Sequence, residues 1–396
     1  MKAVILAAGR GTRLWPLSES SPKVLTPASN RPIIDYVVEA LVKNDVRDIA
    51  VVVGHQKEAV ISHLGDGSKL GARISYFLQE RPLGTAHALV SALPFLDEPF
   101  LVTPGDNFFD AHLVKDAMEA DADNVIMLSR SDKPSNYGVV SQEGCRVVEI
   151  DEKPQDSRSN VISTGVYRLQ PDVAKIIHEE VERGEHSLSS ALNRNLSRLD
   201  LQGVMAKGIW QDAVYPWDLL PLNRAAMSIR GQTQLGNLEE GVVLRGPVQI
   251  GRGSRIRAGC YIEGPVVIGE GCEIGPYVSI FPHTVLGNEV QVDPYTLISG
   301  SVAHGAVRIG SHCHISRSIL GRNTSVGPGC YLASGPATIV RDDKIIHRDD
   351  IGGIIGPDTS IGAGVSLRPG VQVGSSCKVL AGAVLKDNLS SNTEAV

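Results

Sequence analysis

The first half of the chain alternates short apolar runs with longer amphipathic stretches. Seven apolar runs have the length and composition of buried β-strands: residues 2–7, 48–53, 74–78, 99–103, 124–129, 145–150 and 161–168. Between several of these runs, apolar positions recur with helical spacing, as at 33–44, 55–64 and 84–94. This alternation predicts an α/β domain with a Rossmann-like, mostly parallel sheet that is covered on both faces. In such folds ligands bind beyond the carboxyl ends of the strands.

From Val242 onward the pattern changes to an aliphatic residue at every sixth position. The series comprises Ile250, Ile256, Ile262, Ile268, Ile274, Ile280, Leu286, Val292 and Ile298, then Leu320, Val326 and Leu332, then Ile355, Ile361, Leu367, Val373, Val379 and Leu385. A fixed period of six is typical of a parallel β-helix, whose interior is filled by one inward aliphatic side chain per short strand. The stretch 333–354 breaks the period and is rich in charged residues, so we expect a loop there.

The two patterns divide the chain. Its 396 residues are too many for one ordinary core, and two domains are expected. We place the α/β domain at residues 1–224, a connection at 225–240 and the β-helix at 241–396.

Composition narrows the classes of function. A net charge of −6 argues against a general nucleic-acid binder. No run approaches the roughly 20 apolar residues of a membrane span, and the start shows no secretory signal. The six cysteines are far apart and include no CxxC pair, which favours neither a disulfide framework nor a zinc site. We therefore expect a cytoplasmic protein that has no nucleic-acid or membrane partner.

The first strand leads into a glycine loop, LAAGRGTR, and a Pro-Lys pair follows ten residues later. A loop with little side-chain bulk lets backbone N–H groups approach a phosphate closely. Arg13 adds charged donors and Lys23 adds a compact cation. The loop is neither the P-loop GxxxxGK[ST] nor the dinucleotide motif GxGxxG.

The order LAAGxGTR and then PK, with Lys23 ten positions after Arg13, resembles the signature of the sugar-1-phosphate nucleotidylyltransferases. The resemblance implies that Arg13 and Lys23 hold the phosphates and act in catalysis. It also implies that the loop wraps a nucleoside triphosphate through Leu6, Ala7, Ala8, Gly9, Gly11 and Thr12.

A second segment, FLQERPLGTAHA, matches the base-recognition segment of the same family through Gln79, Gly84 and Thr85. An amide side chain and backbone groups suit the edge of a pyrimidine. We give His87 no catalytic role. UTP is the preferred nucleotide, and dTTP stays open.

Two aspartates are the candidate magnesium ligands. Asp106 follows an apolar strand, in the crevice where ligands of this fold bind. The segment WQDAVYPWDLLPLN resembles the family's second metal segment and puts Asp212 in the metal position, although Ala213-Val214 replaces the usual Thr-Gly. Mg²⁺ needs few carboxylates when phosphates complete its coordination.

The sugar 1-phosphate is expected at three further segments of the family pattern. The resemblance implies Gly138 in NYGVV, Glu152 and Lys153 in IDEKP, and Ser163 and Thr164 in ISTGVY. Enzymes for N-acetylglucosamine 1-phosphate carry Asn where Ser163 stands. Glucose 1-phosphate and N-acetylglucosamine 1-phosphate therefore both stay candidates.

The second half resembles the left-handed β-helix of hexapeptide-repeat proteins, most of which are trimers. The resemblance implies a homo-oligomer, a trimer or a multiple of three, built through the β-helix. In bifunctional relatives this half acetylates glucosamine 1-phosphate from acetyl-CoA, and His312 is the best match for the catalytic base. The Tyr three residues beyond that base is missing, and the N-I-G-A-G segment is replaced by Ser325-Val326-Gly327-Pro328-Gly329.

The leading interpretation is a Mg²⁺-dependent enzyme that transfers a nucleotidyl group to a sugar 1-phosphate and releases pyrophosphate. The first alternative is a bifunctional enzyme that also acetylates. The second is a non-catalytic nucleotide-sugar sensor or assembly subunit. The joint presence of Arg13, Lys23, Asp106 and Asp212 argues against this second alternative.

Overall fold

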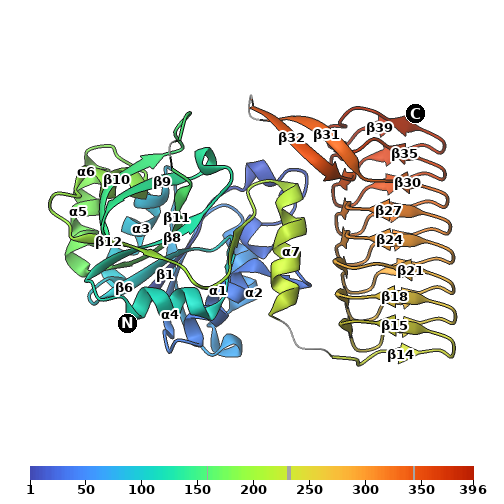
Figure 1. Ribbon diagram of the computed structural model, residues 1–396, viewed down its shortest axis with the longest axis horizontal. Helices are drawn as coiled ribbons and strands as arrows, with labels where there is room; N and C mark the ends of the chain where they lie inside the picture. The colour runs from blue at the N-terminus through green and yellow to red at the C-terminus, as the bar shows by residue number, and fades with distance from the viewer. Residues whose placement is uncertain (158, 230–232, 342–343) are drawn as a thin grey trace. The chain divides into compact units, whose positions relative to one another are not determined.

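The computed structural model describes residues 1–157, 159–229, 233–341 and 344–396. It divides into two compact units (Figure 1). The first comprises Met1–Arg10, Pro22–Leu25 and Pro32–Asp212, and the second comprises Gly11–Ser21, Thr26–Arg31 and Ala213–Val396. The loop that follows the first strand is thus grouped with the second unit.

The first unit is built on one nine-stranded sheet. Its strands lie in the order β5-β4-β1-β6-β11-β8-β12-β10-β9, and only β10 and β11 run opposite to the rest. The strands are β1 (Lys2–Ala7), β4 (Asp48–Val53), β5 (Arg73–Leu78), β6 (Phe100–Pro104), β8 (Asn124–Arg130), β9 (Gly138–Glu143), β10 (Arg146–Glu152), β11 (Val161–Leu169) and β12 (Leu201–Met205). All seven predicted strands are present, and the predicted α/β class is confirmed. The sequence analysis missed β9 and β12.

Helices cover both faces of this sheet, as predicted (Figure 1). In β1, Ala3 and Ile5 point to one face, where they pack with α1 (Ile33–Val42), α2 (Lys57–Leu64) and α4 (Ala111–Glu119). Val4 points to the other face, which is covered by α3 (Thr85–Ser91), α5 (Pro171–Glu182) and α6 (Leu188–Arg194). This two-sided burial explains why the central strands are apolar throughout.

Short elements complete the connections. Beside the main sheet, β7 (Asn107–Phe109) pairs with β13 (Trp210–Asp212), and β2 (Pro27–Ala28) pairs with β3 (Arg31–Pro32). The 3-10 turns are η1 (Thr12–Leu14), η2 (Lys23–Leu25), η3 (Ser68–Leu70), η4 (Leu93–Phe95), η5 (Pro134–Asn136) and η6 (Pro216–Asp218). A last helix, α7 (Leu219–Ser228), precedes the β-helix. Residues 230–232 of the predicted connection lie outside the described residues.

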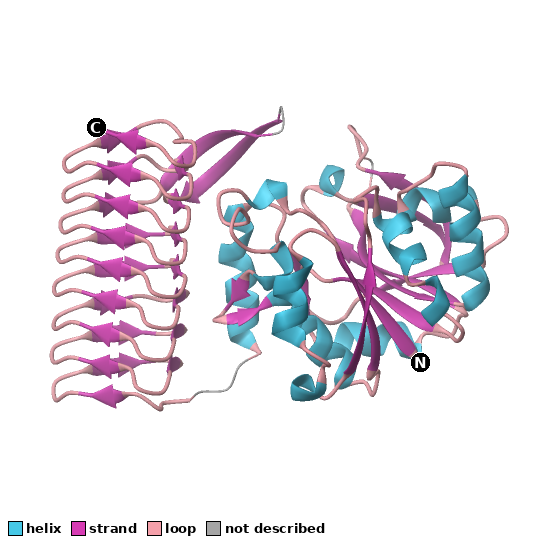
Figure 2. Ribbon diagram, turned by 180° about the vertical axis from the view of Figure 1, so that it is seen from behind, coloured by secondary structure: helices cyan, strands magenta, loops and turns pink. Residues whose placement is uncertain are grey.

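The second unit contains the predicted β-helix, whose coils lie stacked one on the next (Figure 2). Three parallel sheets form its faces. The first sheet holds β14 (Asn237–Leu238), β17 (Arg255–Ile256), β20 (Glu273–Ile274), β23 (Gln291–Val292), β26 (Arg308–Ile309), β29 (Ser325–Val326), β34 (Ser360–Ile361), β37 (Lys378–Val379) and β39 (Glu394–Ala395). The second holds β15 (Val243–Arg245), β18 (Tyr261–Glu263), β21 (Ser279–Ile280), β24 (Leu297–Ser299), β27 (His314–Ser316), β30 (Tyr331–Leu332), β35 (Ser366–Leu367) and β38 (Val384–Leu385). The third holds β16 (Val248–Ile250), β19 (Val266–Ile268), β22 (Thr284–Leu286), β25 (Val302–Ala303), β28 (Ile319–Leu320), β33 (Ile354–Ile355) and β36 (Gln372–Val373).

All the aliphatic residues of the predicted six-residue series are buried in one continuous core. The shift in register after Ile298 has a local cause. Two corners are one residue shorter than the others, so the inward positions become Ala303, Ile309 and Ile315 before the series resumes at Leu320. The inward positions therefore continue between Ile298 and Leu320, where the six-residue series in the sequence is interrupted.

A second inward position lies two residues before each aliphatic one and carries small side chains. Many of these side chains bridge successive coils. Thr296 donates from Oγ1 to the Gly310 carbonyl at 2.8 Å and accepts from the Cys313 N–H at 3.1 Å. Five of the six cysteines are buried here as free thiols: Cys260, Cys272, Cys313, Cys330 and Cys377. Each of these thiols donates to a backbone carbonyl of a later residue in the chain, so the buried S–H groups are paired inside the β-helix.

The expectation of a loop at 333–354 is wrong. This stretch forms an antiparallel hairpin of β31 (Gly335–Arg341) and β32 (Lys344–Ile351). Alternating side chains define its two faces: Ile339 is buried, whereas Val340 and its partner Ile345 are exposed. The many charged residues of this stretch hide the period of two in its sequence.

Candidate active site

The carboxyl ends of seven strands meet at one edge of the first unit's sheet, because only β10 and β11 are reversed. At this edge Leu6 of β1 is the register partner of Pro104 of β6. The Gly105 N–H also donates to the Leu6 carbonyl at 2.9 Å. The chain segments that begin at Ala8 and Asp106 thus leave the sheet side by side, although about 100 residues separate them in sequence.

The glycine loop begins in a tightly packed strand end and then becomes open. Ala7 and Ala8 are buried, and a Cβ on Gly54 would lie only 2.9 Å from the Ala8 carbonyl oxygen. A Cβ on Gly9, in contrast, would meet no protein atom within 4 Å. Packing in the first unit therefore does not demand glycine at this position. The space beside Gly9 suits a ligand that approaches the backbone closely.

The later residues of the glycine loop, from Gly11 onward, belong to the second unit. Gly11 has φ +65° and precedes η1, in which the Leu14 N–H donates to the Gly11 carbonyl at 2.9 Å. Leu14 is fully buried and anchors the turn, whereas Arg13 is exposed. The phosphate-binding roles of Gly11, Thr12 and Arg13 stay predictions.

Lys23 forms an ion pair with the carboxylate of Asp106. The two residues lie 83 positions apart, Lys23 in η2 and Asp106 in the turn between β6 and β7. Their side chains are 15% and 29% exposed, so the pair lies at the surface of the sheet edge and is only partly hydrated. A cation and a carboxylate that are accessible to ligands suit the phosphates and the metal ion expected here.

Asp212, the last residue of the first unit, lies at the same edge of the sheet as Asp106. It ends β13, where its register partner is Asn107, the residue after Asp106. Asp212 is buried, and its carboxylate accepts a hydrogen bond from the Tyr137 hydroxyl at 2.8 Å. The β7–β13 pair is fixed in turn by Asn107 and Trp210, which both donate to the Thr164 carbonyl at 3.2 Å. The two predicted metal ligands thus lie at the same end of the β7–β13 pair, Asp106 in the turn directly before β7 and Asp212 at the end of β13.

These two carboxylates fit Mg²⁺ better than a metal that needs a full protein cage. Among the described residues there is no group of three or more His, Cys, Asp or Glu side chains that could hold a metal. Mg²⁺ is commonly bound through one or two carboxylates, while substrate phosphates and waters supply the other ligands.

The expected base segment is anchored to neighbouring elements. Gln79 is buried at the end of β5, and its backbone N–H donates to the Val53 carbonyl at 2.8 Å. Its side-chain Nε2 donates to the Gly84 carbonyl at 3.0 Å. The Thr85 hydroxyl, a predicted nucleotide contact, accepts from the Leu188 N–H at 2.9 Å.

The expected sugar residues form a compact group around β9 and β10. Gly138 and Glu152 are register partners, and a Cβ on Gly138 would lie 3.2 Å from Glu152 Oε2. Glycine therefore lets this carboxylate lie against the backbone. The Lys153 ammonium is 3.0 Å from Glu152 Oε1, and the Lys153 N–H donates to the Tyr137 carbonyl at 2.9 Å. The group offers both an acceptor for hydroxyls and a cation for a phosphate.

Ser163 and Thr164 lie where β11 departs from regular pairing with β8. The Ser163 hydroxyl is 3.2 Å from that of Tyr167 and accepts from the Gly165 N–H at 3.1 Å. Thr164 is almost fully buried and donates to the Met127 carbonyl at 2.8 Å. Its side chain fixes the irregular strand, and its predicted contact with a sugar stays a prediction.

His312 lies in the second unit, at an exposed corner of the β-helix with φ +56°. Its ring centroid is 5.1 Å from that of Tyr295, which stacks in turn on Tyr277 at 5.5 Å. His314 lies 5.2 Å from Tyr331. The sequence analysis looked for a tyrosine three residues after the histidine and missed these neighbours, which come from adjacent coils.

Other residues near the site were also missed. Asn107 and Trp210 share the Thr164 carbonyl, and His186 accepts from the Ala86 N–H at 2.9 Å. No local motif marks these residues, because each acts through a segment that is distant in sequence. The DN pair at Asp106-Asn107 and the WQD segment were the available signals.

Comparison with known proteins decides the family. The model of the nucleotidyl transferase family matches residues 2–226, more than half of the chain. The chain belongs to the nucleotidyl transferase family. This membership confirms the resemblance noted in the sequence, and with it the interpretation as an enzyme. Within the β-helix, residues 244–349 match the GMPPB C-terminal domain, and residues 354–386 match the hexapeptide repeat of succinyl-transferase.

Several nucleotidyl transferases are similar to it. The bifunctional protein GlmU of Methanococcus maripaludis strain C7 is 37% identical over 99% of this chain and 96% of its own. The glucose-1-phosphate thymidylyltransferase of Streptomyces antibioticus is 33% identical over 65% of this chain and 74% of its own. A crystal structure assigned as a glucose-1-phosphate thymidylyltransferase from Bacillus anthracis, in complex with sucrose, matches with TM-score 0.54 and 30% identity, over 59% of this chain and 98% of that one.

Within the described residues, the longest α-helix has 12 residues, and no helix combines the length and apolar character that crossing a membrane requires.

Proposed function

We propose that the protein transfers a nucleotidyl group from UTP or dTTP to a sugar 1-phosphate, with Mg²⁺ as cofactor. The observation that carries the proposal is the convergence of the Lys23–Asp106 ion pair and Asp212 at one edge of the sheet. Such an edge is where α/β folds bind their ligands. The family membership of residues 2–226 supports the same reaction.

The reaction is a displacement at phosphorus. A phosphate oxygen of the sugar 1-phosphate bonds to the α-phosphorus of the triphosphate, the bond from this phosphorus to the bridging oxygen breaks, and pyrophosphate leaves. The attacking oxygen is already anionic, so no general base is required. The protein has to position the two substrates and compensate their charge.

Each part of the site has a task in this scheme. Lys23 and Arg13 stabilise negative charge on the triphosphate and on the departing pyrophosphate. Glu152 accepts from hydroxyls of the sugar, and Lys153 binds its phosphate. Asp106 and Asp212 would hold Mg²⁺, which supplies charge neutralisation at the phosphates when it is bound. Tyr137 fixes the Asp212 carboxylate through the hydrogen bond at 2.8 Å.

Glucose 1-phosphate and N-acetylglucosamine 1-phosphate are the two sugars that we propose. Similarity to proteins named GlmU favours the acetylated sugar, and similarity to glucose-1-phosphate thymidylyltransferases favours glucose. Ser163, in the position where Asn is typical of enzymes for the acetylated sugar, favours glucose. UTP is the preferred nucleotide and dTTP the alternative.

Pyrophosphate release tests the proposal directly. The purified protein is assayed with UTP, dTTP, CTP, ATP and GTP against glucose 1-phosphate, N-acetylglucosamine 1-phosphate and glucosamine 1-phosphate, each with Mg²⁺ and with EDTA. Turnover is expected with UTP or dTTP and one of the first two sugars, and EDTA should abolish it. Absence of pyrophosphate with every pair would reject the proposal.

A second candidate activity is acetyl transfer by the β-helix. The exposed corner position of His312, beside the ring of Tyr295, supports it, because an accessible histidine can serve as a general base. The similarity of the full chain to proteins named bifunctional GlmU supports it as well. Thiol release from acetyl-CoA with glucosamine 1-phosphate tests this activity, with His312→Ala as the variant that should lose it.

We also propose a homotrimer, or a multiple of three, assembled through the β-helix, and a location in the cytoplasm. Repeats of this class commonly present an extended surface for self-association. The five buried free thiols are compatible with a reducing compartment. Light scattering of the purified protein measures the mass of the assembly.

A further inference from the structure

The protein fixes the orientation of the Gln79 amide. Nε2 of Gln79 donates to the Gly84 carbonyl at 3.0 Å and lies 3.0 Å from Nδ1 of His87. A carbonyl oxygen only accepts, so the amide nitrogen must be on this side and Oε1 on the other. No residue in the described part of the chain donates to Oε1. The amide therefore presents an acceptor and no donor to a base.

His87 takes part in this orientation. An amide NH₂ group only donates, so Nδ1 of His87 must accept, and the imidazole must be neutral with its proton on Nε2. Burial, together with the neighbouring His186, lowers the pKa of His87 below its ordinary value. The two rings meet edge to face with 6.0 Å between their centroids. His87 is thus neutral near pH 7, as the contact with Gln79 requires.

The base segment is also held by the turn between α5 and α6, residues 183–187. The His186 carbonyl accepts from the Ala86 N–H at 2.9 Å, and the next helix begins with the Leu188 N–H bound to the Thr85 hydroxyl at 2.9 Å. A Cβ on Gly84 would lie 2.3 Å from the His186 carbonyl oxygen. Glycine is therefore required here, and the base segment cannot move independently of the turn.

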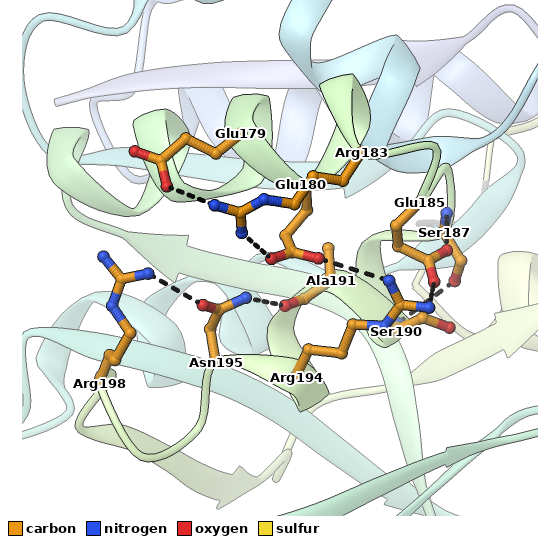
Figure 3. Close-up of polar contacts among 10 residues, drawn as sticks. All are labelled: Glu179, Glu180, Arg183, Glu185, Ser187, Ser190, Ala191, Arg194, Asn195 and Arg198. Atoms are coloured by element: carbon orange, nitrogen blue, oxygen red, sulfur yellow. Dashed lines mark hydrogen bonds and ion pairs between the residues drawn. The ribbon is translucent and has the colours of Figure 1, made fainter.

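An ion-pair network gives the turn its shape (Figure 3). Glu180 of α5 is nearly buried, with a side chain only 7% exposed, and it accepts from Arg183 at 2.9 Å. Arg194 of α6 bridges Glu180 at 3.5 Å and Glu185 at 2.9 Å. Glu185 also accepts from the Ser187 N–H at 2.9 Å. Because Arg194 spans the ends of the turn, it ties both helices to the segment that carries His186.

We propose that His87 and Arg194 are positioning residues for base recognition, which hold Oε1 of Gln79 toward the nucleobase. An acceptor at this point selects a base whose N3 carries a proton, uracil or thymine, over cytosine, whose N3 is an acceptor. The inference rests on the proposed function, because that function makes Gln79 the residue that reads the base. It adds a geometric reason for the choice of pyrimidine and two residues that enforce it.

The first test replaces the acceptor on His87. His87→Leu removes Nδ1, so the Gly84 carbonyl is then the one remaining acceptor of the NH₂ group and the amide is held less firmly. We expect KM for UTP to rise about fivefold, the effect of one neutral hydrogen bond. The preference for UTP over CTP in kcat/KM should fall by at least the same factor, while KM for the sugar 1-phosphate stays unchanged. His87→Asn keeps an acceptor near the position of Nδ1 and should restore the preference.

The second test loosens the turn from a distance. Arg194→Gln removes both ion pairs without touching the base segment, and it should lower the UTP preference in the same direction as His87→Leu. Arg198→Gln is the matched control. It removes the same charge four residues later, where Arg198 donates to Asn195 at 3.3 Å, and it should leave the preference unchanged. Thermal unfolding identifies any variant that has lost its fold.

The outcomes separate this inference from the proposed function. A folded His87→Leu variant with the wild-type ratio of UTP to CTP would overturn the inference even if the enzyme is active. Equal effects of Arg194→Gln and Arg198→Gln would overturn the role of the turn. If the wild type releases no pyrophosphate, the proposed function fails. Calorimetric binding of UTP and CTP to the same variants then decides the inference by itself.

Discussion

The Tyr137 hydroxyl donates a hydrogen bond to the Asp212 carboxylate, with 2.8 Å between the two oxygens. This bond connects the two substrate regions of the candidate site. Tyr137 directly precedes Gly138, the expected sugar contact, and its ring meets that of Trp210 edge on at 5.7 Å. Asp212 is one of the two candidate ligands of the metal. A phenol that is fixed by an aromatic neighbour holds the carboxylate in one orientation.

Tyr137→Phe should therefore weaken the binding of Mg²⁺ and leave the fold intact. Hydrogen bonds that orient a metal ligand are commonly worth about 10- to 100-fold in metal affinity. We expect the Mg²⁺ concentration for half-maximal pyrophosphate release to rise by a factor in this range. Tyr76→Phe is the control, because the Tyr76 hydroxyl donates to the Gly65 carbonyl and not to a candidate metal ligand. A shift of equal size in both variants would contradict the assignment.

Asp106→Asn should lower the rate of pyrophosphate release by about 100-fold or more, because it removes a metal ligand and the partner of Lys23. Asp110→Asn is the matched control on the same connection. Asp110 caps α4 by accepting from the Leu113 N–H, and Asn caps a helix equally well. Circular dichroism checks that both variants fold. Wild-type activity of a folded Asp106→Asn protein would refute the metal site.

Thr296→Val should destabilise the β-helix. The change keeps the shape of the side chain but leaves the Gly310 carbonyl and the Cys313 N–H without their partner in the interior. Unpaired buried polar groups cost about 1–3 kcal/mol each. We expect the unfolding free energy of the β-helix, measured by denaturant titration, to fall by about 2–5 kcal/mol. Thr338→Val, at an exposed hairpin position, should change it by less than about 0.5 kcal/mol.

Stability should fall in acid because of His304. This imidazole is buried, and burial lowers its pKa from 6.5 to about 4. Its folded pKa is lower than its unfolded pKa. The unfolded state therefore binds a proton below about pH 6.5, whereas the folded state binds one only near pH 4. The contribution to stability is complete above pH 6.5 and falls as the pH drops, and the loss reaches about 3 kcal/mol by pH 4.

His304→Leu tests this dependence. The difference in unfolding free energy between pH 7 and pH 4.5 should shrink in the variant by about 2–3 kcal/mol. His347→Gln, which alters an exposed histidine of the hairpin, should leave the difference unchanged. An identical pH profile for wild type and His304→Leu would show that another group controls acid stability.

The sequence was sufficient for the elements whose signal is local and repeated. Each coil of the β-helix repeats one pattern. The six-residue series that begins at Ile250 therefore predicted this fold without any long-range information. The central strands β1, β4 and β6 are apolar on both faces, which a sheet covered on both sides explains. The order of the glycine loop and Lys23 marked the family, because the residues predicted to bind phosphate are confined to one short segment.

What the sequence could not supply are contacts between distant segments. The hairpin β31–β32 was missed because charge obscured its alternation, and two short corners hid the period at Ala303 and Ile309. Strands β9 and β12 gave no clear apolar run.

By itself the sequence determined the two architectures, the family and the types of residue at the site, because these depend on period, composition and short motifs. Only the tertiary structure decided that Tyr137 fixes Asp212, that Lys23 pairs with Asp106, and that His186 holds the Gly84 segment. The partners in these contacts lie 75, 83 and about 100 residues apart. Strand order and register bring these partners together. Neither can be predicted from the sequence immediately around a contact residue.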